Sequence, residues 1–320
     1  MPNPALESVH VNRPLTNISV AYIQQASVFV ASRVFPIVPV AKQSDAYFIY
    51  PKGDWFRSDA EKRAPGTESA GSGYRLENAT YSCDVYAIHK DVDDQIRANS
   101  DSPLNPDRDA TQWVTHQLLL KRELEWASEF FTTGVWTGSS SSTDITPGVK
   151  WDDAASTPIE DVRKEVVAIA EKTGHRPNTF VMGPEVWKAL VDHPDVLDRV
   201  KYTQRDVPTE ALLAQLFGVD RVLTAWATRN TAQEQAADSM DFVFGKNALL
   251  AYAAPSPSLM TPSAGYIFAW TGYTGAGPEG NRISRFRMDH LRSDRIEGEM
   301  AFDMKVVASD VGCFFSAAVA

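Results

Sequence analysis

Apolar residues recur with helical spacing in one long segment, "NPDRDATQWVTHQLLLKRELEWASEFFTTG". This pattern predicts a helix over residues 105–133, with Asn105 as its N-terminal cap, Pro106 in the first turn and Gly134 as its end. A helix of about 28 residues is about 42 Å long, which suits a spine along which other elements pack. We expect its apolar stripe to consist of residues near one face, broadened by three neighbours: Trp113, Leu120, Leu124, Ala127 and Phe131, with Val114, Leu118 and Leu119.

The spacing of apolar residues changes to the two-residue period of β-strands in two segments, "AYFIY" and "TYSCDVYAIH". These segments flank a polar stretch of more than twenty residues. That stretch is rich in charged residues and includes "GTESAGSG". Unstructured connections of this length are uncommon inside compact domains, and an isolated two-stranded hairpin is only marginally stable. We therefore expect residues 46–92 to form a projecting finger that is supported from outside.

The remaining segments predict an arm, an α/β unit and a closing sheet. Residues 1–45 are proline-studded, and Pro36 and Pro39 exclude a helix or a central strand, so this apolar arm has to lie against the core or a neighbouring molecule. Helices alternate with strands from about 158 to 262, around a polar loop at 230–241, which indicates a layered unit. Long antiparallel strands follow from "GYIFAWTGY" to the end. The order predicts an α+β fold.

Composition narrows the function classes. The net charge of −10 and a pI near 5.1 argue against a protein that grips nucleic acid with its whole surface, although not against one that encloses it. Cys83 and Cys313 are far apart, which favours two buried thiols in a reducing compartment over a disulfide framework or a zinc site. The N-terminus lacks the features of a signal peptide, and we expect a soluble, cytoplasmic product.

Catalytic and metal-binding motifs are absent from the sequence. It contains no GxxxxGK[ST], GxSxG or HExxH, and its six histidines form no HxxxH pair. "DVDDQ" at 91–95 begins like a calcium loop but lacks the turn glycine and the terminal glutamate. A Ser-His-Asp arrangement of residues distant in the chain stays open. We predict no catalytic residue, no cofactor and no metal.

The candidate interface residues lie in the finger and in the closing sheet. Large aromatic residues in a polar loop are costly to leave in water, since burial of each contributes roughly 1.5–3 kcal/mol, and aromatics and arginine are common interface anchors. The alternative is that these aromatic side chains pack against other residues of their own loop. The finger candidates are Trp55, Phe56, Arg57, Lys62 and Arg63.

Strand alternation places Arg285 and Arg287 on one face of the closing sheet. We expect this face to contact an acidic neighbour rather than enclosed nucleic acid. The alternative is a solvated face on which the two arginines pair with Asp289 and Asp294.

Several strings together resemble the major capsid proteins of tailed bacteriophages, which have the Hong Kong 97-type coat fold. They include "VFPIVPVAKQSDAYFIYPKGDWFR", "RAPGTESAGSGY", "YSCDVYAIHKDVDDQIRAN" and "FGKNALLAYAAP", and the resemblance runs from about Ala26 to the end. It implies five parts: an N-terminal arm at 1–45, an E-loop hairpin at 46–92, the P-domain spine helix and connecting loop at 93–149, an A-domain at 150–262, and the P-domain closing sheet at 263–320.

The resemblance also implies a function. The chain would assemble into hexamers and pentamers of an icosahedral shell around packaged double-stranded DNA, with the finger lying across the adjacent subunit. Implied partners are other copies of the chain, a separate scaffolding protein, a portal and a decoration protein, with DNA contacted weakly and no membrane. The product would be a virion protein assembled in the host cytoplasm. Some relatives cross-link a lysine of this loop to an asparagine; Lys52 and Lys62 are available, but no matching asparagine is identified.

Two alternative functions remain. An encapsulin-like nanocompartment would have the same fold and enclose protein cargo. A cytosolic α/β enzyme with a long insertion would be a small particle with a defined pocket.

The shell interpretation also makes two structural predictions. We expect the finger and the proline-studded arm to lack sufficient partners within their own chain. We expect the centre of a capsomer to be lined by the 230–241 loop, with 201–208 as its rival.

Overall fold

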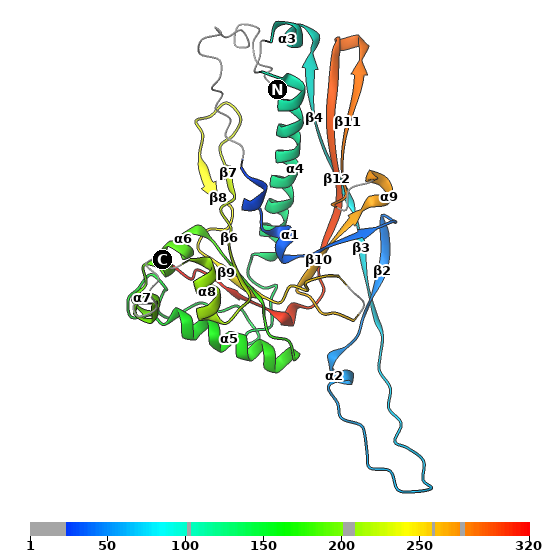
Figure 1. Ribbon diagram of the computed structural model, residues 1–320, viewed down its shortest axis with the longest axis vertical. Helices are drawn as coiled ribbons and strands as arrows, with labels where there is room; N and C mark the ends of the chain where they lie inside the picture. Colours follow the sequence, from blue (N-terminus) through cyan, green and yellow to red (C-terminus); the bar gives the residue numbers. More distant parts are fainter. Residues whose placement is uncertain (1–23, 101–103, 201–208, 258–259, 276–278) are drawn as a thin grey trace.

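The computed structural model describes residues 24–100, 104–200, 209–257, 260–275 and 279–320. Figure 1 shows an elongated molecule, in which a long helix lies beside a tall sheet, an α/β unit packs to one side, and a finger extends beyond the body. The predicted 1–45 arm is described only from Gln24, and the predicted 201–208 turn lies outside the described residues.

The spine helix is α4 (Pro106–Phe130), and its predicted start is confirmed, because the Asn105 side chain accepts a hydrogen bond from the Arg108 N–H at 3.1 Å. The predicted apolar stripe is confirmed at Val114, Leu118 and Phe131, but its centre is wrong by about one position around the helix. Buried positions follow steps of four residues, so the core face consists of Ala110, Val114, Leu118, Arg122, Trp126 and Phe130, together with Glu123. Four of the five predicted stripe residues are only half-buried on its flank: Trp113, Leu120, Leu124 and Ala127.

A five-stranded sheet packs on α4 and has the order β1-β10-β12-β11, with β4 paired to β12. Close approach depends on Gly298 of β12, where a β-carbon would lie 2.3 Å from Cγ1 of Val114. The strands are β1 (Ile37–Val40), β4 (Asp84–Asp93), β10 (Gly265–Trp270), β11 (Asn281–Met288) and β12 (Ser293–Val306).

Strand β4 corrects the predicted extent of the finger. It pairs with β12 from Asp84↔Phe302 to Asp93↔Ser293, so residues 84–93 belong to the body rather than to the projection. Ten consecutive residue pairs hold β4 in the sheet of the body, whereas the prediction assigned this strand to the finger from its local sequence pattern alone. The projecting finger therefore ends near Ser82.

A second, four-stranded sheet, with the order β13-β9-β5-β6, forms the core of the α/β unit. Its C-terminal strand corrects the predicted 263–320 boundary, because β13 pairs with β9 and not with the closing sheet. Helices alternate with strands in this unit, as the sequence predicts, and the first helix, α5 (Pro158–Thr173), ends at Gly174, whose φ is +68°. The strands are β5 (Thr179–Met182), β6 (Arg221–Thr224), β9 (Ala248–Ala251) and β13 (Gly312–Phe315), and the helices are α5 (Pro158–Thr173), α6 (Pro184–Val191), α7 (Pro194–Val200) and α8 (Glu210–Phe217).

The shorter elements join these layers. The predicted polar loop at 230–241 is the connection of a small hairpin, β7 (Thr228–Asn230) and β8 (Met240–Phe242). Further helical turns are η3 (Ala26–Val28), α1 (Ala31–Val34), α3 (Asp94–Asn99), α9 (Thr271–Thr274), η4 (Asp289–Leu291) and η5 (Ser309–Val311).

The end of the arm packs into its own chain, which corrects the expectation that the arm lacks internal partners. Phe35 is fully buried, with its ring 5.7 Å from Trp126 and 5.0 Å from Phe130. The Glu123 carboxylate accepts hydrogen bonds from the N–H groups of Val30 and Ala31, at the start of α1. The prediction from the prolines is confirmed, since β1 is an edge strand of its sheet.

Candidate intersubunit surface

The finger begins as a two-stranded sheet and continues as irregular chain. Strands β2 (Ser44–Ile49) and β3 (Glu77–Ser82) pair from Ser44↔Ser82 to Ile49↔Glu77. Below them lies α2 (Lys52–Trp55), after which the chain runs out to the tip and back without regular structure (Figure 1). Five large apolar side chains on the finger are exposed: Phe48, Trp55, Phe56, Tyr74 and Leu76.

The base of the finger packs firmly on the body. The Tyr81 ring stacks on Phe268 of β10 with centroids 4.5 Å apart, and Tyr47 lies 5.3 Å from the same ring. Cys83 is buried beside them, and burial raises the pKa of its thiol to about 12. Burial likewise raises the pKa of Cys313, so the predicted buried thiols are confirmed for both cysteines.

Trp55 lies at the root of the finger and not at its tip. We define the root as residues 50–56 together with Tyr74 and Arg75. The Trp55 ring is 6.0 Å from Tyr50 and 5.4 Å from Tyr74, so it bridges the two sides of the finger. The Asp54 carboxylate accepts hydrogen bonds from the backbone N–H of Arg75 at 2.9 Å and from its Nε at 3.0 Å, which lowers the pKa of Asp54. The sides of the finger are thereby tied together.

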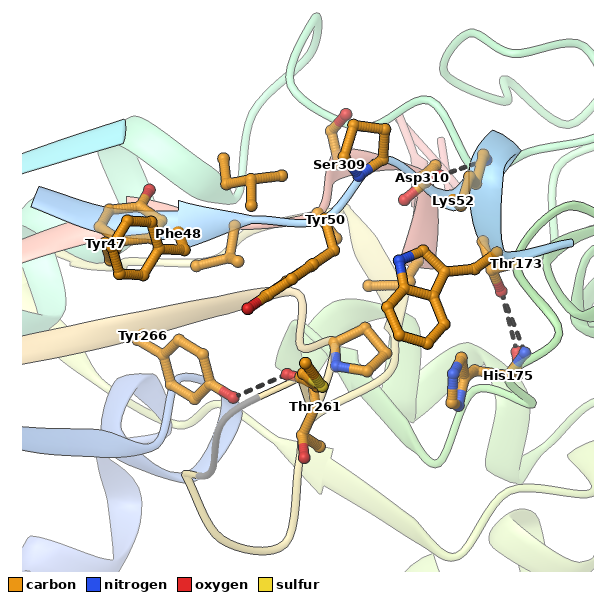
Figure 2. Close-up of a pocket in the computed structure, with 18 of the residues that line it drawn as sticks. Tyr47, Phe48, Tyr50, Lys52, Thr173, His175, Thr261, Tyr266, Ser309 and Asp310 are labelled. Carbon is orange, nitrogen blue, oxygen red and sulfur yellow. Dashed lines mark hydrogen bonds and ion pairs between the residues drawn. The ribbon is translucent and has the colours of Figure 1, made fainter. Parts of the chain in front are cut away.

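The root also touches the body at two points. Lys52 forms an ion pair with Asp310 of η5. The Phe56 ring lies against Gly174, where an added β-carbon would be 3.0 Å from its Cζ atom. Between these contacts and the base lies a cleft of about 980 Å³. In Figure 2, Tyr47, Phe48 and Tyr50 line one side of this cleft, Thr261 and Tyr266 the other, and the Lys52–Asp310 pair one end.

The other finger candidates are exposed. Arg57, Lys62 and Arg63 lie on the irregular part, and Arg63 donates a hydrogen bond to the carbonyl of Thr67 across a turn. Trp55 and Phe56 thus have contacts in their own chain, as the self-capping alternative predicts, yet they remain 51% and 62% exposed. Their role at an interface stays a prediction.

Arg285 and Arg287 lie on β11, and both pair with one carboxylate on β12. Arg285 Nε lies 3.1 Å from Asp294 Oδ2, and Arg287 Nη1 lies 3.3 Å from Asp294 Oδ1. The hydrogen bond from Arg285 is the largest cause that lowers the pKa of Asp294, to about 2. Arg287 also pairs with Asp289 at 3.4 Å. The alternative of intrachain pairing is therefore present, and contact with an acidic neighbour stays a prediction.

A serine and a histidine do lie within hydrogen-bonding distance in the α/β unit, but the hydrogen bond between them has the wrong direction for nucleophilic catalysis. His193 Nδ1 accepts a hydrogen bond from the backbone N–H of Asp195 at 3.1 Å, so the proton of the neutral ring lies on Nε2. That nitrogen faces Ser156 Oγ at 2.9 Å and the Asp153 carbonyl at 3.0 Å. A general base would have to accept the serine proton at this nitrogen. The pair instead ties a loop to α7.

The described residues contain neither a metal-binding cluster nor a helix that could span a membrane. There, no group of three His, Cys, Asp or Glu side chains is arranged to hold a metal ion. The calcium-like 91–95 segment uses its carboxylates otherwise: Asp91 pairs with Arg295 at 2.7 Å, and Asp93 caps α3. Across the same part of the chain, no helix is both long and apolar enough to span a bilayer.

Comparison with known proteins supports the resemblance. Residues 138–254 match the family described as phage major capsid protein E. The major capsid protein of Burkholderia phage BcepMu is 22% identical over 311 residues, 96% of each chain, and that of Pseudomonas phage JBD67 is 24% identical over 313 residues, 97% of each chain. The chain is thus similar to phage major capsid proteins over nearly its whole length. The resemblance that the sequence indicates is therefore confirmed.

Solved structures confirm the fold. A phage-related protein from Bordetella bronchiseptica RB50 superposes with a TM-score of 0.69 and 22% identity, over 93% of this chain and 94% of that one. A subunit of the bacteriophage PhiM1 mature capsid gives 0.63 and 12%, over 97% and 92%. The SrpI encapsulin of Synechococcus elongatus PCC 7942 gives 0.52 and 11%, over 99% and 96%. The chain has the predicted α+β, Hong Kong 97-type fold.

Sequence reasoning missed two features of the site. Lys52 and Asp310 are 258 residues apart, and nothing local marks them as partners. Glu123 is a charged residue on the core face of α4, where a periodicity argument expects an apolar one. A charged residue that interrupts the buried face of a helix is the signal that could have identified it.

Proposed function

We propose that this capsid protein assembles into the hexamers and pentamers of an icosahedral shell that encloses packaged double-stranded DNA. One observation carries the proposal: the finger projects from the body with five exposed apolar side chains, of which Phe56 is 62% exposed. Burial of such side chains on an adjacent copy would contribute roughly 1.5–3 kcal/mol each when complete. A head-to-tail arrangement of fingers closes into rings, as capsomers require.

Under this proposal the exposed charges of the finger, Arg57, Lys62 and Arg63, contact the neighbouring copy, and Arg285 and Arg287 face another subunit. The net charge of −10 suits a container whose contact with DNA is weak and independent of sequence. A scaffolding protein, a portal and a decoration protein are further proposed partners. The protein is placed in the virion, after assembly in the host cytoplasm, and has no catalytic role.

Negative-stain microscopy of the purified chain tests the proposal. The wild type is expected to form uniform shells or capsomer rings. Replacement of Phe48, Phe56 and Leu76 by serine, which removes three of the five exposed apolar side chains, should abolish them and leave the circular dichroism of the body unchanged. Val167→Ser, on the exposed face of α5, is the matched control and should assemble normally. Shells that form equally well from the triple variant would refute the role of the finger.

The encapsulin similarity supports a second candidate, a shell that encloses protein cargo. The two candidates differ in what the native particle contains. Particles from the natural source should carry nuclease-protected double-stranded DNA if the first proposal holds. Particles that carry an enzyme and no protected DNA would favour the second.

A further inference from the structure

The direction of the finger is set by few contacts, all of them at its root. Above the root, β2 and β3 hold the base through Tyr47 and Tyr81. Between Phe48 and Lys52 the chain crosses the 980 Å³ cleft, which leaves room below it. Beyond the root, the side-chain hydrogen bonds are internal to the finger, such as that of Ser72 with Asp59.

The two contacts with the body are placed on rigid elements. Asp310 belongs to η5, which is anchored because Thr137 N–H donates to the Ser309 carbonyl at 3.0 Å and because Val311 is buried. Gly174 ends α5 and donates its N–H to the Ala170 carbonyl at 2.9 Å. The body therefore offers two fixed points, against which Lys52 and Phe56 rest.

On the finger side, the two sides of the root are joined. The Asp54–Arg75 pair and the three rings of Tyr50, Trp55 and Tyr74 connect them. Loss of the body contacts would let the finger swing about its base, and it would also loosen the single turn of α2, which carries Lys52 and ends at Phe56. The contacts themselves are weak, because the Lys52 side chain is 49% exposed and exposed ion pairs change an equilibrium only by a factor of roughly one to five.

We propose that the finger root is a latch, which holds the finger of an unassembled copy in one direction and is released when the finger docks on a neighbouring copy. This inference rests on the proposed function, because docking supplies the reason for release. The contacts that attach the root to the body below the cleft are weak and lie within one chain. They suit this role, since the larger interface of a neighbour would replace them. With the latch closed, the finger of every unassembled copy points in the same direction. After release, the finger can adopt the different directions that positions of different curvature in the shell require.

Hydrogen–deuterium exchange of the full chain tests the latch. In protomers kept unassembled by dilution, Asp310→Asn should speed exchange of the root amides by roughly two- to fivefold, in line with the loss of one exposed ion pair. The informative amides are Asp54, Phe56 and Arg75, which donate hydrogen bonds within the root. Phe56→Ala is the second variant and should have a similar effect. Asp220→Asn, the same charge change on an exposed loop, is the control and should have none.

Charge reversal sharpens the test. Lys52→Asp alone should speed exchange at the root, and Lys52→Asp combined with Asp310→Lys should restore the wild-type rate. Unchanged rates in Asp310→Asn and Phe56→Ala would overturn the latch, and so would a structure of the shell in which Lys52 still contacts Asp310 of its own copy. Neither result would affect the shell proposal. Failure of the wild type to assemble at all would refute that proposal and leave the exchange comparison in protomers intact.

Discussion

The spine helix and the finger each carry a tryptophan, and the two side chains lie in opposite environments. Trp126 of α4 is 0% exposed and packs among Phe35, Phe131 and Phe244, whereas Trp55 at the finger root is 51% exposed. One chain thus contains an apolar residue that its own core covers and another that it leaves half uncovered. The spine is stabilised by intrachain burial, while the finger carries apolar surface suited to another molecule.

The largest expected difference comes from truncating these two tryptophans. Trp126→Ala should lower the free energy of unfolding by about 3–5 kcal/mol, because it opens a cavity in the aromatic core. Trp55→Ala should cost the protomer only about 1 kcal/mol, the scale of its ring contacts, and should lower the yield of shells. Chemical denaturation followed by circular dichroism measures the first effect, and microscopy the second. Equal losses of protomer stability would show that the comparison is wrong.

The same contrast explains what the sequence could predict. The spine, the helix ended by Gly174 and the strands of both sheets follow from local periodicity and capping, which act within a few residues. The core face of α4 was misplaced because it depends on contacts with β12, including the approach allowed by Gly298. The positions of β4 and β13 were missed because pairing partners such as Phe302 and Leu250 are far away in the chain.

For the candidate site, the sequence predicted which types of residue are exposed better than it predicted where they lie. An exposed aromatic pair in a polar loop was foreseen, but its position at the root depends on the ring contacts of Trp55 with Tyr50 and Tyr74. The pairing of Arg285 and Arg287 with Asp294 was foreseen as an alternative, because strand alternation fixes which side chains share a face. No local pattern could indicate the contact of Lys52 with Asp310.

The anchor of the arm should show an unusual pH dependence. Burial raises the pKa of Glu123 to about 7 from an ordinary 4.5, and the hydrogen bonds from the Val30 and Ala31 N–H groups, with the neighbouring Arg122, offset this only in part. Between about pH 4.5 and 7 the folded state therefore binds more protons than the unfolded state, so stability falls as pH rises through this window. The full effect is on the order of 3 kcal/mol, since each pKa unit corresponds to about 1.4 kcal/mol.

Glu123→Gln tests this assignment, because it removes the titration but keeps only one of two acceptors for the N–H groups of Val30 and Ala31. The variant should be less stable than wild type by about 1 kcal/mol at pH 5, the scale of one hydrogen bond. It should equal or exceed wild type at pH 8. Glu171→Gln, exposed on α5, is the control and should leave the pH profile unchanged. Parallel profiles for Glu123→Gln and wild type would contradict the raised pKa.

The ion pairs of the closing sheet should change the free energy of unfolding with pH less than Glu123 does. The pH dependence should also have the opposite sign, since stability is lost as pH falls. The pKa of Asp294 is lowered to about 2, mainly by the hydrogen bond from Arg285, so its contribution is present above about pH 4 and is lost as pH falls toward 2. Asp294→Asn should therefore flatten acid unfolding in that window, with a smaller loss at pH 7 than Trp126→Ala causes. Acid titration followed by circular dichroism measures it. An acid-unfolding curve identical to that of wild type would show that the pairing is without effect on stability.

The smallest expected effect is the reaction of the two thiols, which compares the finger base with the α/β core. Cys83 lies under the finger base and Cys313 in β13, and burial raises the pKa of both, so a thiol-directed alkylating reagent should modify neither in the folded chain at pH 8. Mass spectrometry after a timed reaction measures this, with the urea-unfolded chain as the positive control. The finger swings about its base in the proposed latch, and the base itself stays packed on Phe268, so Asp310→Asn should leave Cys83 as unreactive as Cys313. Modification of Cys83 in that variant would mean that the base opens together with the root, and the hinge would then have to lie deeper in the sheet.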